Sequence, residues 1–188
     1  FKPNLEGINT LDKISLEILR NYIDWSPFFH AWELRGLYPK ILDDHDKGEE
    51  AKKLFREANK LLSKIIDNDL LKARAVFGIF KAKSFNEKIE IVDHNIKFNF
   101  PRQLVDKGST PNFCLADFIS STQVDYIGLF AVTAGHGVDQ MVSQFESDND
   151  DYNSIMVKVL ADRLAEATAE WLHEKIRKEI WGYSKNEN

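Results

Sequence analysis

Hydrophobic positions follow a helical spacing in the first part of the chain. A short helix is predicted over residues 11–23, and a second is expected to begin with Ser26 as its N-cap and to end at Gly36. Residues 48–67 are amphipathic at the same spacing, so this segment should pack one face against the rest of the protein. Residues 11–67 are therefore predicted to form a group of N-terminal helices.

The spacing changes to that of β-strands between residues 74 and 133. Short apolar or alternating runs, separated by polar turn residues, occupy residues 74–85, 89–93 and 96–100. Residues 125–133 are the strongest strand candidate, and their apolar residues on both faces predict a central place in a sheet. Residues 138–183 return to helical spacing. This order of elements predicts a single α+β domain over residues 1–188, with a largely antiparallel sheet.

The last segment, Asp150 to Tyr183, is a Pro-free run of strong helix formers with two apolar faces. One face carries Met156, Leu160, Leu164, Ala167 and Trp171, and the opposite one carries Ile155, Ala165, Ala169, Ile176 and Ile180. A helix with two apolar faces should be buried on both sides. We therefore predict one long, central C-terminal helix.

Acidic residues form a column on this helix. Asp162, Glu166 and Glu170 are spaced four apart, and each like-charge pair at this spacing costs about 0.2–0.5 kcal/mol. A solvated ridge accounts well for Glu170 and for Glu174, which has basic residues three and four positions later. It accounts less well for Asp162 and Glu166, for which the helical cation considered is Lys158, four positions before Asp162. For these two, a cation-binding or hydrogen-bonding role and a purely structural one both stay open.

Composition narrows the classes of partner. The 188 residues carry a net charge of −5, with 43% hydrophobic and 29% charged residues, and no dense basic cluster that would favour nucleic acid or an anionic membrane. The one cysteine, Cys114, lies in an apolar run and is expected to pack as a small buried residue, consistent with a reducing compartment. No apolar run is long enough to cross a bilayer, so a cytoplasmic location is expected.

Short motifs give little support for catalysis or metal binding. Asp43, His45 and Gly48 form D-x-H-x-x-G, which resembles the cobalt-ligating signature of one class of cobalamin-binding domains. Here the motif lies in an acidic loop between two predicted helices, which favours a solvated loop. The histidines lack zinc-site spacing, and no G-x-S-x-G is present, so no catalytic or metal-ligating residue is predicted.

Aromatic residues are dense around Asp24, which lies at a predicted helix entrance. They are Tyr22, Trp25, Phe28, Phe29, Trp32 and, further on, Tyr38. This group can be a corner of the core. It can also be a wall that binds a cationic or flat ligand by stacking and by cation–π attraction, worth about 0.5–2 kcal/mol.

Four segments resemble the reactivation domain of cobalamin-dependent methionine synthase, and the match, in which they follow in the expected order, spans nearly the whole chain. They are NYIDWSPFFHAWELRGLYPKILDD, FCLADFI, DYIGLFAVT and DDYNSIMVKVLADRLAEATAEWLHEKIRKEIWGY. The resemblance implies a domain that binds S-adenosylmethionine and docks on a cobalamin-binding domain, where flavodoxin or another reductase supplies an electron for remethylation of cob(II)alamin. It also implies that Asp24 contacts the ligand and that Asp162 and Glu166 lie at or near the same site.

One departure from the family limits these expectations. Members of the family continue beyond the helix that ends in WGY into an R-P-A-P-G-Y-P segment, which makes many of the contacts with the ligand. This sequence ends in SKNEN and does not begin with Met, so it reads as a piece of a methyltransferase with no complete catalytic centre. We expect weak or no S-adenosylmethionine binding by these residues alone. The alternative is a stand-alone docking module of the same fold that does not bind S-adenosylmethionine.

Overall fold

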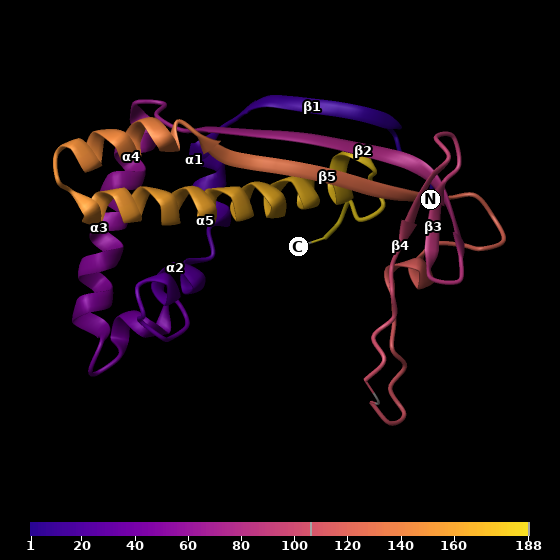
Figure 1. Cartoon of the computed structure of the whole chain (residues 1–188), viewed down its shortest axis with the longest axis horizontal. Helices are drawn as coiled ribbons and strands as arrows, with labels where there is room; N and C mark the ends of the chain where they lie inside the picture. Colours follow the sequence, from indigo (N-terminus) through magenta and orange to yellow (C-terminus); the bar gives the residue numbers. More distant parts are fainter. Residues whose placement is uncertain (106, 188) are drawn as a thin grey trace. The chain divides into compact units, whose positions relative to one another are not determined.

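Helices and strands alternate in blocks along the chain, as Figure 1 shows for the computed structural model, which describes residues 1–105 and 107–187. The elements, in order, are β1 (Gly7–Ile14), α1 (Leu16–Leu19), η1 (Arg20–Tyr22), α2 (Trp25–Ala31), η2 (Lys40–Asp43), α3 (Gly48–Asp67), β2 (Lys72–Phe85), β3 (Lys88–Ile91), β4 (Ile96–Asn99), η3 (Leu115–Phe118), β5 (Asp125–His136), α4 (Val138–Ser147), α5 (Asp151–Lys175) and the π-helical turn η4 (Ile176–Ile180). The fold is α+β, as predicted.

The strands form one sheet with the order β1-β2-β3-β4, and β5 also pairs with β2. Both β2–β3 and β3–β4 are antiparallel, and β2 turns into β3 through a two-residue hairpin in which Phe85 faces Lys88. Asn86 in this hairpin has a φ of +54°, a conformation that asparagine adopts more readily than most residues. The predicted antiparallel sheet is therefore confirmed for these strands.

The chain divides into two compact units, and each is described by itself. Unit 1 contains Phe1–Asn9, Phe77–Phe130 and Ile176–Asn188, and unit 2 contains Thr10–Val76 and Ala131–Lys175. In unit 1, a small cluster forms around Ala82, Ile89, Cys114 and Ala116, against which Phe100, Ile119 and Ile127 pack. Cys114 is thus a buried free thiol, as its apolar surroundings predict.

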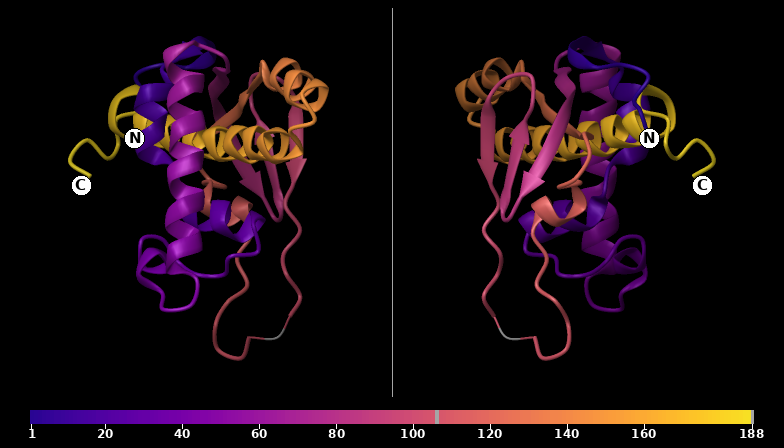
Figure 2. Two further views of the ribbon diagram at one scale, coloured as in Figure 1. Left: turned by 90° about the vertical axis from the view of Figure 1, so that its left-hand side faces the viewer. Right: turned by 90° about the vertical axis from the view of Figure 1, so that its right-hand side faces the viewer.

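Unit 2 holds a larger core of helices. Fully buried side chains come from α1, α2, α3 and α5 and include Leu19, Phe28, Phe29, Leu62, Ile65, Met156, Leu160, Leu164 and Leu172. The elements α1, η1, α2 and α4 all pack on α5. The helix α3 also contacts α5 but runs across it rather than along it, as the views in Figures 1 and 2 agree. The long helix α5 therefore holds the helical part of unit 2 together.

Burial on α5 is more one-sided than its two apolar faces predict. Met156, Leu160 and Leu164 are completely buried, but on the opposite face Ile155 is 49% exposed and Ala165 is only partly buried. The reason is that the other helices of unit 2 pack along one main face of α5. The helix itself begins at Asp151, one residue later than predicted, and Asp150 accepts a hydrogen bond from the backbone N–H of Asn153 at 3.0 Å.

Three predicted elements differ in the structure. Residues 7–14 form the strand β1, whose alternating exposure has the period of two that strands show, so the helix predicted over 11–23 is reduced to α1 and η1. The helix α2 ends at Ala31 rather than Gly36, because Glu33 adopts a φ of +61° and the chain turns back. Finally, β5 pairs only with β2 among the described strands, so it is not the central strand; β2 has that role.

Candidate functional site

Asp24 begins the helix α2 and is its N-cap. Its Oδ1 atom accepts a hydrogen bond from the backbone N–H of Ser26 at 2.9 Å, so the cap lies two residues earlier than the Ser26 cap predicted from the sequence. Ser26 lies inside the helix instead, where its buried hydroxyl accepts a hydrogen bond from the backbone N–H of Tyr38. The Asp24 side chain is exposed, and within the described part of the chain its second oxygen has no hydrogen-bond partner. One carboxylate oxygen is therefore free to bind a ligand.

Tyr22 links the segment before Asp24 to α5. Its hydroxyl donates a hydrogen bond of 2.7 Å to Oε2 of Glu174. This hydrogen bond, followed by burial and by the negative charge of Glu174, raises the pKa of the Tyr22 phenol above its usual value. Glu174 is therefore not merely part of a solvated ridge, because it holds the residue two positions before Asp24 in place.

Asp162 and Glu166 share a cation, Arg163, that the prediction overlooked, although it lies three residues before Glu166, a spacing at which helical side chains meet. The guanidinium of Arg163 donates to Oδ2 of Asp162 at 2.6 Å and also to Oε2 of Glu166. The Arg163 side chain is only 13% exposed, whereas those of Asp162 and Glu166 are 72% and 49% exposed. Lys158, which the sequence offered as their partner, lies 3.8 Å from Glu146 instead. The two acids thus form an exposed, partly neutralised pair on α5.

The three predicted site residues all belong to unit 2. The elements η1 and α2, on either side of Asp24, pack on α5, which carries Asp162 and Glu166. In residues 1–105 and 107–187, however, no hydrogen bond or ion pair joins Asp24 to either acid. The arrangement is thus one carboxylate at a helix N-terminus and a carboxylate pair on the helix that this region packs against.

Three of the six aromatic residues near Asp24 are part of the core. Phe28 and Phe29 are completely buried, and Trp25 is nearly so. The Trp25 ring packs edge-on against Phe28 and against Phe55 of α3, with ring centroids 5.2 and 4.9 Å apart. For these three residues the structure favours the interpretation as a corner of the core, and their packing fixes the start of α2 and with it Asp24.

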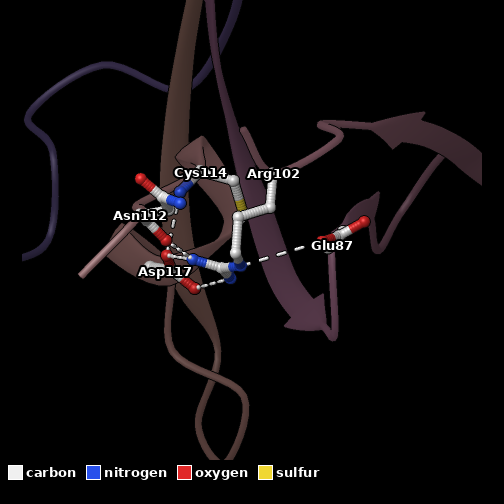
Figure 3. A network of polar contacts seen from close by, with 5 residues as sticks. All are labelled: Glu87, Arg102, Asn112, Cys114 and Asp117. Carbon is white, nitrogen blue, oxygen red and sulfur yellow. Dashed lines mark hydrogen bonds and ion pairs between the residues drawn. The ribbon is translucent and has the colours of Figure 1, made fainter. Parts of the chain in front are cut away.

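A network of polar contacts in unit 1 was not predicted from the sequence (Figure 3). Arg102 makes two hydrogen bonds to the carboxylate of Asp117, at 2.5 and 2.6 Å, and it also donates to the backbone oxygen of Asn112. These bonds from Arg102, followed by the one from the backbone N–H of Cys114, hold the pKa of Asp117 well below its usual range. The network ties both ends of the segment between β4 and η3 together, which is a structural role.

No signal in the sequence identifies this network. Arg102 is separated from Asn112 and Asp117 by 10 and 15 residues, and no periodicity links them. Among the described residues, no cluster of three or more His, Cys, Asp or Glu side chains could hold a metal ion. His45 of the D-x-H-x-x-G motif lies in a loop with its side chain almost completely exposed. No described helix combines the length and the apolar composition needed to span a membrane.

Comparison with known proteins gives the family. The family described as the activation domain of vitamin B12 dependent methionine synthase matches residues 15–188. Among solved structures, the crystal structure of the MetH reactivation domain bound to AdoHcy (S-adenosylhomocysteine) is 46% identical to this chain, with a TM-score of 0.92. That match covers 100% of this chain and 60% of the other, so this chain spans about three-fifths of the length of its relative. This chain therefore belongs to the family of the activation domain of vitamin B12-dependent methionine synthase.

Proposed function

We propose that this chain forms part of an S-adenosylmethionine site in a methionine synthase. The observation that carries this proposal is its 46% identity, over the whole chain, to a reactivation domain that binds AdoHcy. AdoHcy is S-adenosylmethionine without the sulfonium methyl group, so a site for one ligand has nearly the size and the polar groups needed for the other. What the longer relative binds, acts on and assembles with is carried to this chain as part of the proposal.

In this proposal Asp24 bonds the amino group of the ligand. Its second carboxylate oxygen is exposed, while the first one is engaged in capping α2, so the position of the carboxylate is fixed before a ligand arrives. A hydrogen bond between a carboxylate and an ammonium group is typically worth about 1.5–3 kcal/mol. Asp162 and Glu166 add negative charge that favours a ligand with a positive sulfonium and a positive ammonium.

The chemistry proceeds when the domain docks on the cobalamin-binding domain of the same enzyme. S-adenosylmethionine supplies the methyl group, and flavodoxin or another reductase supplies one electron, for remethylation of cob(II)alamin. The residues of this chain bind and position the methyl donor, and they contain no complete catalytic centre. The parent enzyme transfers a methyl group from 5-methyltetrahydrofolate to homocysteine in its ordinary cycle, in the cytoplasm.

We expect these 188 residues alone to bind S-adenosylmethionine weakly or not at all. The resemblance to the family implies that the R-P-A-P-G-Y-P segment contributes much of the ligand contact, and this sequence does not contain it. Binding is therefore best measured on the full-length protein.

Isothermal titration calorimetry with the full-length protein tests the proposal. The unaltered protein should bind S-adenosylmethionine, and Asp24→Asn should weaken binding by about tenfold or more, because it removes the charge that faces the ammonium group. Asp67→Asn is a matched control, since Asp67 is an exposed acid at the end of α3 and is not one of the proposed site residues. Full affinity in Asp24→Asn would show that Asp24 is not a ligand-binding residue. No binding of S-adenosylmethionine or AdoHcy by the unaltered protein, with binding to a cobalamin domain retained, would favour the docking module instead.

A further inference from the structure

Arg163 lies between the two acids of α5 and shapes the charge that they present. Its guanidinium bonds Asp162 through one terminal nitrogen and Glu166 through the other. No other described residue forms an ion pair or a hydrogen bond with either of these side-chain carboxylates. Arg163 is therefore the only cation that the described structure gives to the pair.

Exposure differs sharply between the arginine and the acids. The Arg163 side chain is 13% exposed and is held under the protein surface, whereas both carboxylates reach solvent. A ligand that approaches this part of α5 meets the acids first. One oxygen of each carboxylate faces Arg163, and the other oxygens remain for a ligand.

The charge of this group follows from its members. Two carboxylates and one guanidinium leave a single net negative charge. Without Arg163, two like charges would stand four residues apart on one helix, where they repel each other and would lose their fixed geometry. Arg163 thus both positions the acids and limits their combined charge.

We propose that Arg163 is a positioning residue that sets how strongly the site distinguishes a sulfonium ligand from its neutral thioether product. This inference rests on the proposed function. S-adenosylmethionine and AdoHcy share the adenosyl and amino acid groups and differ by one methyl group and one positive charge. Contacts that the two ligands share therefore cancel in the ratio of their affinities, and the charge of the acidic pair determines most of what remains.

A series of variants that changes this charge in steps tests the inference. Arg163→Gln increases the negative charge of the group by one, Asp162→Asn decreases it by one, and Arg163→Lys leaves it unchanged. Calorimetry on the full-length protein gives the affinities for S-adenosylmethionine and AdoHcy, and circular dichroism checks that each variant is folded. Repeating the titrations at about 0.5 M NaCl screens the charges of exposed groups.

We expect the ratio of affinities, S-adenosylmethionine over AdoHcy, to follow the charge. It should rise about three- to tenfold in Arg163→Gln and fall by a similar factor in Asp162→Asn, as expected for one unit charge several ångströms from the sulfonium. Arg163→Lys should keep the original ratio, and high salt should reduce all differences. A purely structural role for Arg163 would lower both affinities together and leave the ratio unchanged.

The outcomes separate this inference from the proposed function. If the unaltered protein binds both S-adenosylmethionine and AdoHcy but the ratio stays the same across the series, or moves against the charge, the role of Arg163 is wrong and the proposed function stands. If Arg163→Gln does not fold, Arg163→Met removes the same charge and takes its place: the ratio should rise, and an unchanged ratio contradicts the role of Arg163. If the unaltered protein binds neither S-adenosylmethionine nor AdoHcy, both the proposed function and this inference are wrong.

Discussion

Asp24 has two roles in this account, and two substitutions at this position separate them. As the N-cap of α2 it accepts a hydrogen bond from the backbone N–H of Ser26 at 2.9 Å, and as a proposed ligand contact it offers its second oxygen. Asparagine caps helices about as well as aspartate, whereas alanine does not. Asp24→Asn therefore keeps the cap and loses the charge, while Asp24→Ala loses both.

The expected sizes of the two effects differ. Loss of the cap should cost about 1 kcal/mol in the free energy of unfolding, which lowers the Tm of a chain of this length by about 2–4 °C. Asp24→Asn should remain within about 0.5 kcal/mol of the unaltered protein. Affinity for S-adenosylmethionine should fall by about tenfold or more in both variants, because both remove the carboxylate.

Urea unfolding and calorimetry on the same preparations measure both quantities. Equal stability loss in Asp24→Asn and Asp24→Ala would show that the charge, and not the cap, stabilises α2. Retained affinity in Asp24→Asn with reduced affinity in Asp24→Ala would mean that binding depends on the structure of the start of α2 rather than on the charge of the carboxylate. Either result would refute the separation of roles drawn from the hydrogen bond to Ser26.

Three further predictions concern the elements that hold the site. On α5, Leu160→Ala should lower the free energy of unfolding by about 2–5 kcal/mol, because Leu160 is fully buried. Ile155→Ala, at a half-exposed position of the same helix, should lower it by less than about 1 kcal/mol. Equal losses in urea unfolding would contradict one-sided burial of α5. Gly137→Ala should lower the free energy of unfolding by about 1–3 kcal/mol, because Gly137 has a φ of +102° and a Cβ there would clash with a backbone oxygen. Gly135, where a Cβ has room, gives the control Gly135→Ala. No difference between the two variants in thermal unfolding would count against strain at this turn. Burial, followed by the hydrogen bond to Glu57 and the charge of that residue, raises the pKa of Tyr152. Its contribution to the free energy of unfolding is therefore complete below a pH of about 10, where the unfolded tyrosine still keeps its proton, and is lost as the pH rises further. Tyr152→Phe should flatten this alkaline decline in urea titrations, and an unchanged decline would exclude Tyr152 as its source.

Long periodic elements could be predicted from the sequence because their signals are local. The helix α3 was predicted at Gly48–Asp67, the bounds that it has. Its predicted apolar face is buried except for Phe55, which is only partly buried; the buried members are Ala51, Leu54, Ala58, Leu61, Leu62 and Ile65. The strands β2 to β4 follow from short alternating runs separated by turns. In these segments, local propensity and tertiary packing favour the same structure.

The errors occur where a distant partner decides the local structure. Residues 11–14 have enough helical character to suggest a helix, yet pairing with β2 makes them part of β1. The position of β5 in the sheet likewise depends on which strands pair with it, and the apolar pattern of β5 does not indicate its partners. Local spacing is therefore a guide to the type of an element more than to its neighbours.

The candidate site shows the same limit. The residue types at Asp24, Asp162 and Glu166 and the resemblance to a known family led us to predict them as site residues, and this stays a prediction. Their surroundings were predictable only in part: Arg163 stands three positions before Glu166, a usual spacing for helical ion pairs, but its bond to the adjacent Asp162 follows no helical spacing. Likewise, no pattern indicated that Tyr22 reaches Glu174, 152 residues further along the chain.

A crystal structure of the full-length protein with S-adenosylmethionine or AdoHcy would show whether Asp24 binds the ligand. We expect the ligand amino group to lie within hydrogen-bond distance of the Asp24 carboxylate, with the ligand sulfur on the side of Asp162 and Glu166. A ligand bound away from Asp24, with both acids still facing solvent, would contradict it.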